Sequence, residues 1–341
     1  MEKTIYILGA GFSRFANLPL MKDFYFRSKD LYPQLKKIGE QKAFLNVFKY
    51  FDEFSKVKNI MNADFYNIEE LFSIIEMDAY LNNKKQIYKD IISFLNLVIE
   101  LSSPQKEDEE GYFTIDSTNN TDIYSYFLME VYGIEKIDKH YVYNRKPGNK
   151  NGIISLNYDL LIEKSINIFN KYNKKIMDPN YISFDFEYGL DEKFIKPLYT
   201  LKPRFPKLNL AKLHGSLNFH YGDLPIIIPP TWNKTTEKKM KSVWELAYRL
   251  LISAEKIVFI GYSLAETDIY IKYLLISGIK ESYNLKRVEI ICDDKDNSVK
   301  NRYYKFFDEN FRNKAVEFYS QKFEEWFKKP KPENKIISKQ W

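Results

Sequence analysis

The chain has 341 residues, of which 45% are hydrophobic, so it is long enough for one large α/β domain or two smaller ones. Its 52 basic and 46 acidic residues are mixed along the chain and leave a net charge of +6. Such mixing is typical of a solvated surface, so nucleic-acid binding by this chain alone is not expected. The single cysteine, Cys292, excludes a disulfide framework and a CxxC zinc site within one chain.

No apolar run approaches the roughly 20 residues that a membrane-spanning helix needs. The apolar stretch from Ile5 to Leu8 is too short for a signal peptide, and a glycine turn follows it at once. We therefore expect a cytoplasmic protein with no membrane contact.

The first half of the chain predicts one strand and then a large helical insertion. Thr4 to Leu8 reads as a buried strand, and residues from about 21 to 145 are expected to be mostly helical. Asn67 and Glu70 resemble a capping box. The helix that they open carries core-facing positions at helical spacing, namely Leu71, Ile74, Ile75 and Ala79. Ser102 to Thr121 is polar and is expected to be a surface loop.

The second half alternates between strands and helices. Strands are predicted at 153–156, 208–213, 218–221, 225–228, 257–260, 288–291 and 315–318, and helices at 160–172, 236–253, 267–279 and 298–311. Residues 174–205 are expected to be irregular, and 328–341 to be a flexible tail. This order predicts an α/β fold: a Rossmann-like, mostly parallel sheet with helices on both faces and a large helical insertion after the first strand.

Four short segments of small and polar residues each close a predicted strand. They are Gly9-Ala10-Gly11-Phe12-Ser13, Asn157-Tyr158-Asp159, His214-Gly215-Ser216 and Gly261-Tyr262-Ser263. In an open α/β sheet, ligands bind outside the carboxyl ends of the strands. The four segments therefore predict one ligand-binding crevice assembled from the whole sequence.

The glycine turn favours a nucleotide ligand but not hydride transfer. Gly9 and Gly11 would let backbone N–H groups approach a phosphate closely. The dinucleotide fingerprint requires a third glycine where this chain has Arg14, and no acidic residue ends a second strand about 20 residues later. An ordinary tight turn between a strand and a helix is the alternative.

Asn157 and His214 are the candidates for chemistry. The Asn157 amide could bind ribose hydroxyls and position a water, and Asp159 could hold the loop or a second hydroxyl; alternatively, the segment is an Asx turn that caps the next helix. An imidazole ordinarily has a pKa of about 6.5, which suits a general base at His214. A hydrogen-bonded structural histidine is the alternative there, and the one favoured for His140 and His220. No second ligand at metal spacing accompanies His214.

Later strand ends add further candidates. Gly261, Tyr262 and Ser263 could approach a phosphate or ribose, and Asp293 could accept hydrogen bonds from an adenosine ribose. Asp268 is expected to cap the helix that follows it, and Asp294 to be a solvated turn residue. The segment 229–231 is either a rigid wall of the same crevice or a loop.

Taken together, these segments resemble the SIR2 family in its bacterial SIR2-like branch. The matching residues are the glycine turn with Pro19 downstream, Ser155 to Asp159, Lys212 to Ser216, and Gly261 to Ser263, in the family's order. The resemblance implies a Rossmann-like NAD-binding domain over residues 1–327, with NAD held by the glycine turn and by Gly261 to Ser263. It also implies that Asn157 and His214 form the catalytic pair.

The single cysteine departs from protein-deacylating sirtuins, whose zinc module needs four cysteines, so no zinc is expected. Zinc-free chains of this kind resemble NAD-hydrolysing effectors of bacterial antiphage defence, which act in oligomers or beside a partner ATPase or sensor. We therefore expect an NAD+ glycohydrolase that forms nicotinamide and ADP-ribose. In this expectation, backbone amides near Gly9, Gly11 and Gly261 hold the pyrophosphate. A protein deacylase or ADP-ribosyltransferase, a non-catalytic NAD or ADP-ribose sensor, and a nucleic-acid binder are the alternatives, in that order.

Overall fold

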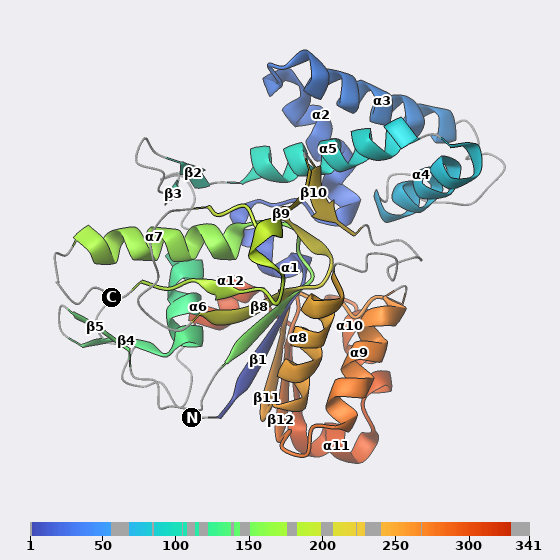
Figure 1. Ribbon diagram of the computed structural model, residues 1–341. Helices are drawn as coiled ribbons and strands as arrows, with labels where there is room; N and C mark the ends of the chain where they lie inside the picture. Colours follow the sequence, from blue (N-terminus) through green and yellow to red (C-terminus); the bar gives the residue numbers. More distant parts are fainter. Residues whose placement is uncertain are drawn as a thin grey trace.

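The computed structural model describes residues 2–55, 68–83, 85–103, 105–107, 113–115, 122–137, 140–143, 151–175, 183–198, 207–222, 224–228, 240–266 and 268–328. Its centre is a seven-stranded sheet in the order β13-β12-β11-β1-β6-β8-β7 (Figure 1). The strands are β1 (Thr4–Leu8), β6 (Gly152–Ser155), β7 (Phe186–Glu187), β8 (Leu208–Lys212), β11 (Lys256–Ile260), β12 (Arg287–Ile291) and β13 (Val316–Tyr319).

Every neighbouring pair in this sheet is parallel. The central strand β1 is buried along its whole length, as is β6. Apolar runs without alternation are typical of strands that are covered on both faces. The predicted Rossmann-like parallel sheet is therefore confirmed.

Helices cover both faces of the sheet. On the face towards which Ile7 and Phe259 point, α8 (Lys241–Ile252) packs at Gly152 through Leu250, and α10 (Ser298–Phe306) packs its Tyr303 ring 5.1 Å from that of Phe259. On the opposite face, α6 (Asp122–Tyr132) brings its Phe127 ring 5.2 Å from that of Tyr6. Both faces of the central strands are thus covered, which leaves the ends of these strands for contact with a ligand.

The residues between β1 and β6 form the insertion. Its helices are α1 (Ala10–Ser13), α2 (Phe24–Leu31), α3 (Ile38–Ser55), α4 (Ile68–Asn82), α5 (Lys85–Ser102) and α6, with 3-10 turns at Arg14–Ala16, Met21–Asp23 and Tyr32–Gln34. Figure 1 shows α2 to α5 gathered beyond the carboxyl edge of the sheet. Leu71 and Ile75 of α4 are buried, while Ile74 and Ala79 are half-buried, so this face of α4 points inward as predicted. Asn67 lies outside the described residues.

Two small antiparallel hairpins depart from the predicted insertion. Strands β2 (Gln105–Glu107) and β3 (Phe113–Ile115) pair within the segment expected to be a loop, and β4 (Ile134–Ile137) pairs with β5 (His140–Tyr143). The expectation of a loop throughout 102–121 is therefore wrong for these residues. Strands of three or four residues, one of them polar throughout, are too short to carry a period-two apolar pattern.

The second half follows its predicted order with four differences. The expectation of irregular structure throughout 174–205 is wrong for β7, whose two residues pair with β8 and are too few to carry a periodic signal. The helix expected over 298–311 is divided into α10 and α11 (Glu309–Ala315), because the Asp308 carboxylate caps α11 by accepting the Asn310 and Phe311 N–H groups at 2.9 and 3.4 Å. β9 (Gly215–Tyr221) starts earlier than expected and pairs antiparallel with β10 (Leu224–Ile227). The other helices are α7 (Leu161–Lys175), α9 (Ile269–Lys280) and the unpredicted α12 (Phe323–Lys328). Residues 329–341 of the expected tail lie outside the described residues.

Among the helices in the described ranges, none is both long and apolar enough to span a bilayer.

Candidate functional site at the carboxyl edge of the sheet

The segments that follow β1, β6, β8 and β11 lie side by side at the carboxyl edge. Each extends the ladder of backbone hydrogen bonds by one step, because its first residue donates its N–H to the end of a neighbouring strand. These bonds run from Gly9 to Ile260 at 3.0 Å, from Leu156 to Leu8 at 2.9 Å, from Leu213 to Ser155 at 3.0 Å and from Gly261 to Ile291 at 2.8 Å. The expectation that the four closures meet at one edge is confirmed.

The turns after β1 and β11 interlock through their glycines. The chain leaves β1 towards β6 and β8 on one side and returns to β11 on the other, so the strand order reverses between β1 and β11. Gly261 has φ +64, and a Cβ added to it would lie 2.2 Å from the Phe12 nitrogen. A Cβ on Gly9 would lie 2.6 Å from the Gly261 oxygen, and one on Gly11 2.7 Å from the Gly261 Cα. Glycine is thus required on both sides of this contact.

This contact corrects the expected role of the glycine amides. Gly9 donates its N–H to Ile260, Gly11 donates to the Gly261 oxygen at 2.9 Å, and Gly261 donates to Ile291. The three amides are therefore already engaged within the protein and do not face a pyrophosphate. In this structure the glycines serve the close approach of two backbones.

Asn157 is the centre of a hydrogen-bond network that reaches the glycine turn. Its Nδ2 donates to the Gly9 oxygen at 2.9 Å and to Ser13 Oγ at 3.0 Å. Ser13 Oγ in turn donates to Asp159 Oδ2 at 2.8 Å. A backbone carbonyl can only accept, so the atom that faces Gly9 must be the amide nitrogen. Among the described residues none donates to Asn157 Oδ1, and this half-buried residue keeps an acceptor for a ligand hydroxyl or a water.

Asp159 holds the loop and also caps a helix. Its Oδ1 accepts the Leu161 N–H at 3.0 Å, at the start of α7, and its Oδ2 accepts from Ser13. The capping alternative and the loop-holding alternative are therefore both met. Because each carboxylate oxygen of Asp159 accepts a hydrogen bond from the protein, the main role of this side chain is to hold the loop that carries Asn157.

His214 is buried beside the same loop. It is 5% exposed, and its Nδ1 lies 3.1 Å from the Leu156 oxygen, directly before Asn157. Because that oxygen can only accept, Nδ1 carries the proton in the neutral ring, and the lone pair lies on Nε2. Such a tautomer is suited to accepting a proton at Nε2. The two candidates for chemistry are thus joined through one peptide group.

A buried ion pair lies behind the loop. Lys212, two residues before His214, donates from Nζ to Glu163 Oε1 at 2.9 Å and to the Asp159 carbonyl oxygen. Both side chains are 2% exposed. Burial raises the pKa of Glu163, and the charge and hydrogen bond of Lys212 oppose that shift. Sequence reasoning did not assign a role to this pair, because Glu163 comes from α7 and only the fold brings it to Lys212.

α10 holds the segment after β11 by two consecutive side chains. Arg302 Nε donates to the Ser263 oxygen at 2.9 Å, and the Tyr303 hydroxyl donates to the Tyr262 oxygen at 3.0 Å. Asp268 makes no capping bond through its side chain, contrary to expectation, and its Oδ2 accepts from the Tyr262 hydroxyl at 3.2 Å. The guanidinium of Arg302 therefore lies at the carboxyl edge, beside Ser263.

The two aspartates after β12 differ in their surroundings. Asp293 is exposed, whereas Asp294 is 6% exposed and accepts the Val299 and Lys300 N–H groups at 3.3 and 2.9 Å. The expectation of a solvated Asp294 is wrong, because its carboxylate caps the first turn of α10. Burial and these two aspartates raise the pKa of Cys292 to about 11.

The remaining candidates lie apart from this network or outside the description. The ring of His220 lies on β9, with Nε2 3.0 Å from the Leu217 oxygen, as expected of a structural histidine. The side chain of His140 and the segment 229–231 fall outside the described residues.

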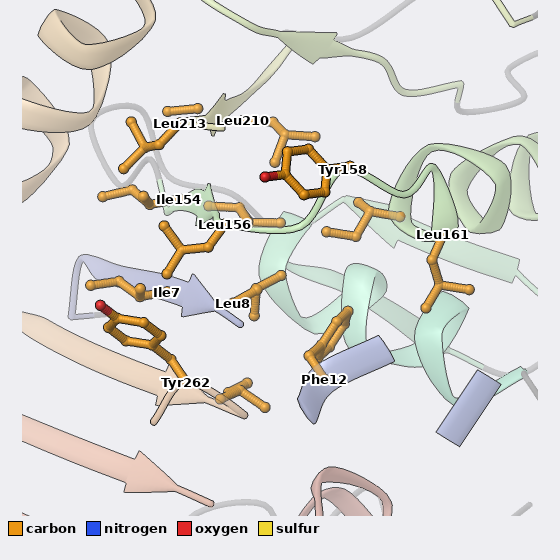
Figure 2. Close-up of a cluster of buried hydrophobic side chains, with 14 of the residues drawn as sticks. Ile7, Leu8, Phe12, Ile154, Leu156, Tyr158, Leu161, Leu210, Leu213 and Tyr262 are labelled. Carbon is orange, nitrogen blue, oxygen red and sulfur yellow. The ribbon is translucent and has the colours of Figure 1, made fainter. Parts of the chain in front are cut away.

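Apolar side chains support the edge from beneath. Figure 2 shows Ile7, Leu8, Ile154, Leu156 and Leu213 gathered with Phe12, Tyr158 and Tyr262, which come from the closing segments. Tyr124, which belongs to α6 of the insertion, also contacts the glycine turn. Its hydroxyl donates to the Phe12 oxygen at 2.9 Å and accepts the Ala16 N–H at 3.1 Å. Burial, with a contribution from the Asp159 charge, holds the pKa of Tyr124 well above its usual value. The insertion is thus fixed to the back of the glycine turn.

Within the described ranges, no group of three or more His, Cys, Asp or Glu side chains is placed to hold a metal ion.

A seven-stranded parallel sheet with its polar closures at one edge defines a Rossmann-like α/β domain. Residues 151–310 match the family model described as a SIR2-like domain. The family resemblance expected from the sequence is confirmed over these residues.

Similarity to solved structures is found at low sequence identity. The chain is 13% identical to the protein in "The Structural basis of Sirtuin Substrate Affinity", with a TM-score of 0.40 over 95% of this chain and 91% of that one. It is 11% identical to "Sir2-p53 peptide-NAD+", with a TM-score of 0.38 over 95% and 90%. It is 12% identical to "Structure of Sir2Tm bound to a propionylated peptide", with a TM-score of 0.36 over the same shares. A search of curated proteins gave no significant match.

Proposed function

We propose that this protein is an NAD+ glycohydrolase, which releases nicotinamide from NAD+ and leaves ADP-ribose. The observation that carries the proposal is the placement of Asn157 and His214 around one peptide group at the carboxyl edge of a SIR2-like domain. NAD is the expected substrate because the family resemblance implies it.

The reaction breaks the bond between ribose C1′ and the pyridinium nitrogen. Its electron pair goes to that nitrogen, so nicotinamide leaves as a neutral molecule, and positive charge develops on the ribose. A positively charged leaving group needs no general acid, in contrast to ordinary glycoside hydrolysis. The protein must orient the ribose, supply one water and accept one proton.

Asn157 orients the attacking water or a ribose hydroxyl. Its two N–H bonds to Gly9 and Ser13 fix the amide plane, and Oδ1 then accepts a hydrogen bond from the ligand. A fixed acceptor costs little reorganisation when the reaction occurs.

His214 accepts the proton through Nε2, either from the water that attacks C1′ or from a ribose hydroxyl. Its Nδ1–H bond to Leu156 sets the tautomer and would stabilise the imidazolium that forms.

The rest of the dinucleotide extends towards the β11 and β12 ends. The Arg302 guanidinium pairs with the negative charge of the diphosphate. Its Nε donates to the Ser263 oxygen, and its terminal nitrogens have no acceptor among the residues that the structure describes. The exposed carboxylate of Asp293 accepts hydrogen bonds from the adenosine ribose. Ala10 and Ser263 complete the surface that contacts NAD, whereas Phe12 and Tyr262, which are 1% and 5% exposed, are too buried for a contact with the ligand and support that surface from within the fold.

Nicotinamide release from NAD+ by the purified full chain tests the proposal, with products separated by chromatography. Equimolar nicotinamide and ADP-ribose, formed without any added acceptor, are expected. Turnover that depends on an acylated peptide would instead favour a deacylase. A protein whose mass rises by that of one or more ADP-ribose groups would favour an ADP-ribosyltransferase, and either result would replace this proposal. Tight NAD binding without turnover at any protein concentration would favour a sensor.

An unrestrained NAD+ glycohydrolase would exhaust the NAD of its own cell. We therefore propose that the protein is an NAD-depleting effector of bacterial antiphage defence, that it acts in the cytoplasm, and that it does so without zinc. Its activity would be controlled by assembly into a homo-oligomer or by a partner ATPase or sensor. Turnover that rises faster than linearly with protein concentration would support control by assembly.

A further inference from the structure

The Lys212–Glu163 pair is unusual because it is an ion pair removed from water beside the candidate catalytic loop. Both side chains are 2% exposed, and their charged atoms are 2.9 Å apart. Removing two charges from water is costly, and apolar residues of similar size often serve stability equally well. Stability alone therefore gives little reason for this pair.

The third partner of the pair is part of the Asn157 loop. Lys212 Nζ also donates to the Asp159 carbonyl oxygen, in the peptide between Asp159 and α7. The Asp159 carboxylate then accepts from Ser13 Oγ, and Ser13 accepts from the Asn157 amide. Lys212 is thus linked to Asn157 by hydrogen bonds on either side of Asp159: one to its carbonyl oxygen and one to its carboxylate.

Lys212 reaches the other candidate through the backbone. It ends β8, and His214 follows two residues later. β8 is itself paired with β6, from which Asn157 follows. Lys212 therefore contacts the Asn157 loop through its side chain and leads into His214 through its backbone.

We propose that the Lys212–Glu163 pair is a positioning device: Glu163 orients the Lys212 ammonium, and Lys212 fixes the Asp159 peptide so that Asn157 is held in register with His214. This inference rests on the proposed NAD+ glycohydrolase function. Neither residue touches the substrate, so the pair acts on turnover through Asn157 and not on NAD binding.

The test replaces the whole pair by apolar side chains of similar length, in the double variant Lys212→Met with Glu163→Met. The matched control is Lys256→Met with Glu289→Met. It removes an ion pair whose charged atoms are 2.6 Å apart and whose side chains are 18% (Lys256) and 11% (Glu289) exposed. Lys256 is the first residue of β11, so this pair lies at the amino end of that strand. For each protein, kcat and KM of nicotinamide release and the melting temperature are measured.

The double variant is expected to melt near the wild-type temperature, to lose about 100-fold in kcat and to change KM less than about threefold, because a displacement of about 1 Å can cost that much turnover. The control is expected to keep its kcat. The single variant Glu163→Gln retains an acceptor for Lys212 and should therefore keep most of the wild-type kcat, in contrast to the double variant. A folded double variant with wild-type kcat overturns the proposal, and so does a kcat loss of the same size in the control.

A second readout does not depend on NAD turnover. Amide hydrogen exchange of residues 156–161 should speed up at least about tenfold in the double variant and remain unchanged in the control. If the wild-type chain releases no nicotinamide, the proposed function fails, and exchange alone decides whether the pair holds the loop. Unchanged exchange over 156–161 in the double variant overturns the positioning role.

Discussion

The contact between the two glycine turns makes a quantitative prediction for Gly261→Ala. The substitution adds a Cβ at 2.2 Å from the Phe12 nitrogen and 2.4 Å from the Gly11 carbonyl carbon, and both are backbone atoms that cannot rotate away. It also requires alanine to adopt φ +64. The turn after β1 must then move away from β11, and the bond from the Gly11 N–H to the Gly261 oxygen is strained or lost.

Two controls separate the causes. Gly222 has φ +69 but nothing within 4 Å of an added Cβ, so Gly222→Ala isolates the cost of the positive φ, about 1–2 kcal/mol. Gly39, in α3, has open space and an ordinary φ, so Gly39→Ala should be neutral or stabilise by up to about 1 kcal/mol. Gly261→Ala adds about 1–3 kcal/mol of overpacking and about 1 kcal/mol for the hydrogen bond to the φ cost, or about 3–6 kcal/mol in all.

The free energy of unfolding in urea measures all three variants. The expected order of destabilisation is Gly261→Ala, then Gly222→Ala, then Gly39→Ala. Equal losses for Gly261→Ala and Gly222→Ala would show that the two turns do not interlock, and would refute the account of the edge.

Three further predictions concern groups around the edge. Tyr124→Phe removes a buried hydroxyl with two backbone partners and should lower the free energy of unfolding by about 1–3 kcal/mol, whereas a loss below about 0.5 kcal/mol in the urea titration would contradict those bonds. The Cys292 thiol should react with iodoacetamide at pH 8 at least about tenfold more slowly than glutathione, because a pKa of about 11 leaves little thiolate, and should speed up as the pH rises towards 11; rapid labelling at pH 8 would contradict its burial. Arg302→Met should raise the KM for NAD about tenfold with less than about threefold loss of kcat, since the guanidinium is proposed to meet the diphosphate and not the reacting carbon; an unchanged KM would remove Arg302 from the site.

The sheet and its edge could be predicted because their signals are local. A buried strand followed at once by small and polar residues is visible around Leu8, Ser155, Lys212 and Ile260, and parallel strands bring such ends to one edge. The same logic places Asn157 and His214 next to each other, and the structure joins them through the Leu156 carbonyl.

The partners of these residues could not be predicted, because they come from remote parts of the chain. No sequence pattern links Glu163 to Lys212, or Tyr124 of the insertion to Phe12. Nor does the sequence of a glycine turn reveal whether its amides are available to a ligand. The glycine turn alone suggests that the N–H groups of Gly9 and Gly11 bind a phosphate, yet they donate to the Ile260 and Gly261 oxygens at the end of β11. Short polar hairpins such as β2 and β3 lack any periodic signal.

His214 offers the most direct test of the central claim. His214→Asn keeps a donor for the Leu156 oxygen but removes Nε2, and His220→Gln is the control, because His220 also faces a backbone oxygen and has no proposed role. The measurement is the initial rate of nicotinamide release from NAD+ by the two variants and the wild-type chain. We predict a loss of at least about 100-fold for His214→Asn and none for His220→Gln. Equal rates in all three proteins would contradict the assignment of His214 as the base.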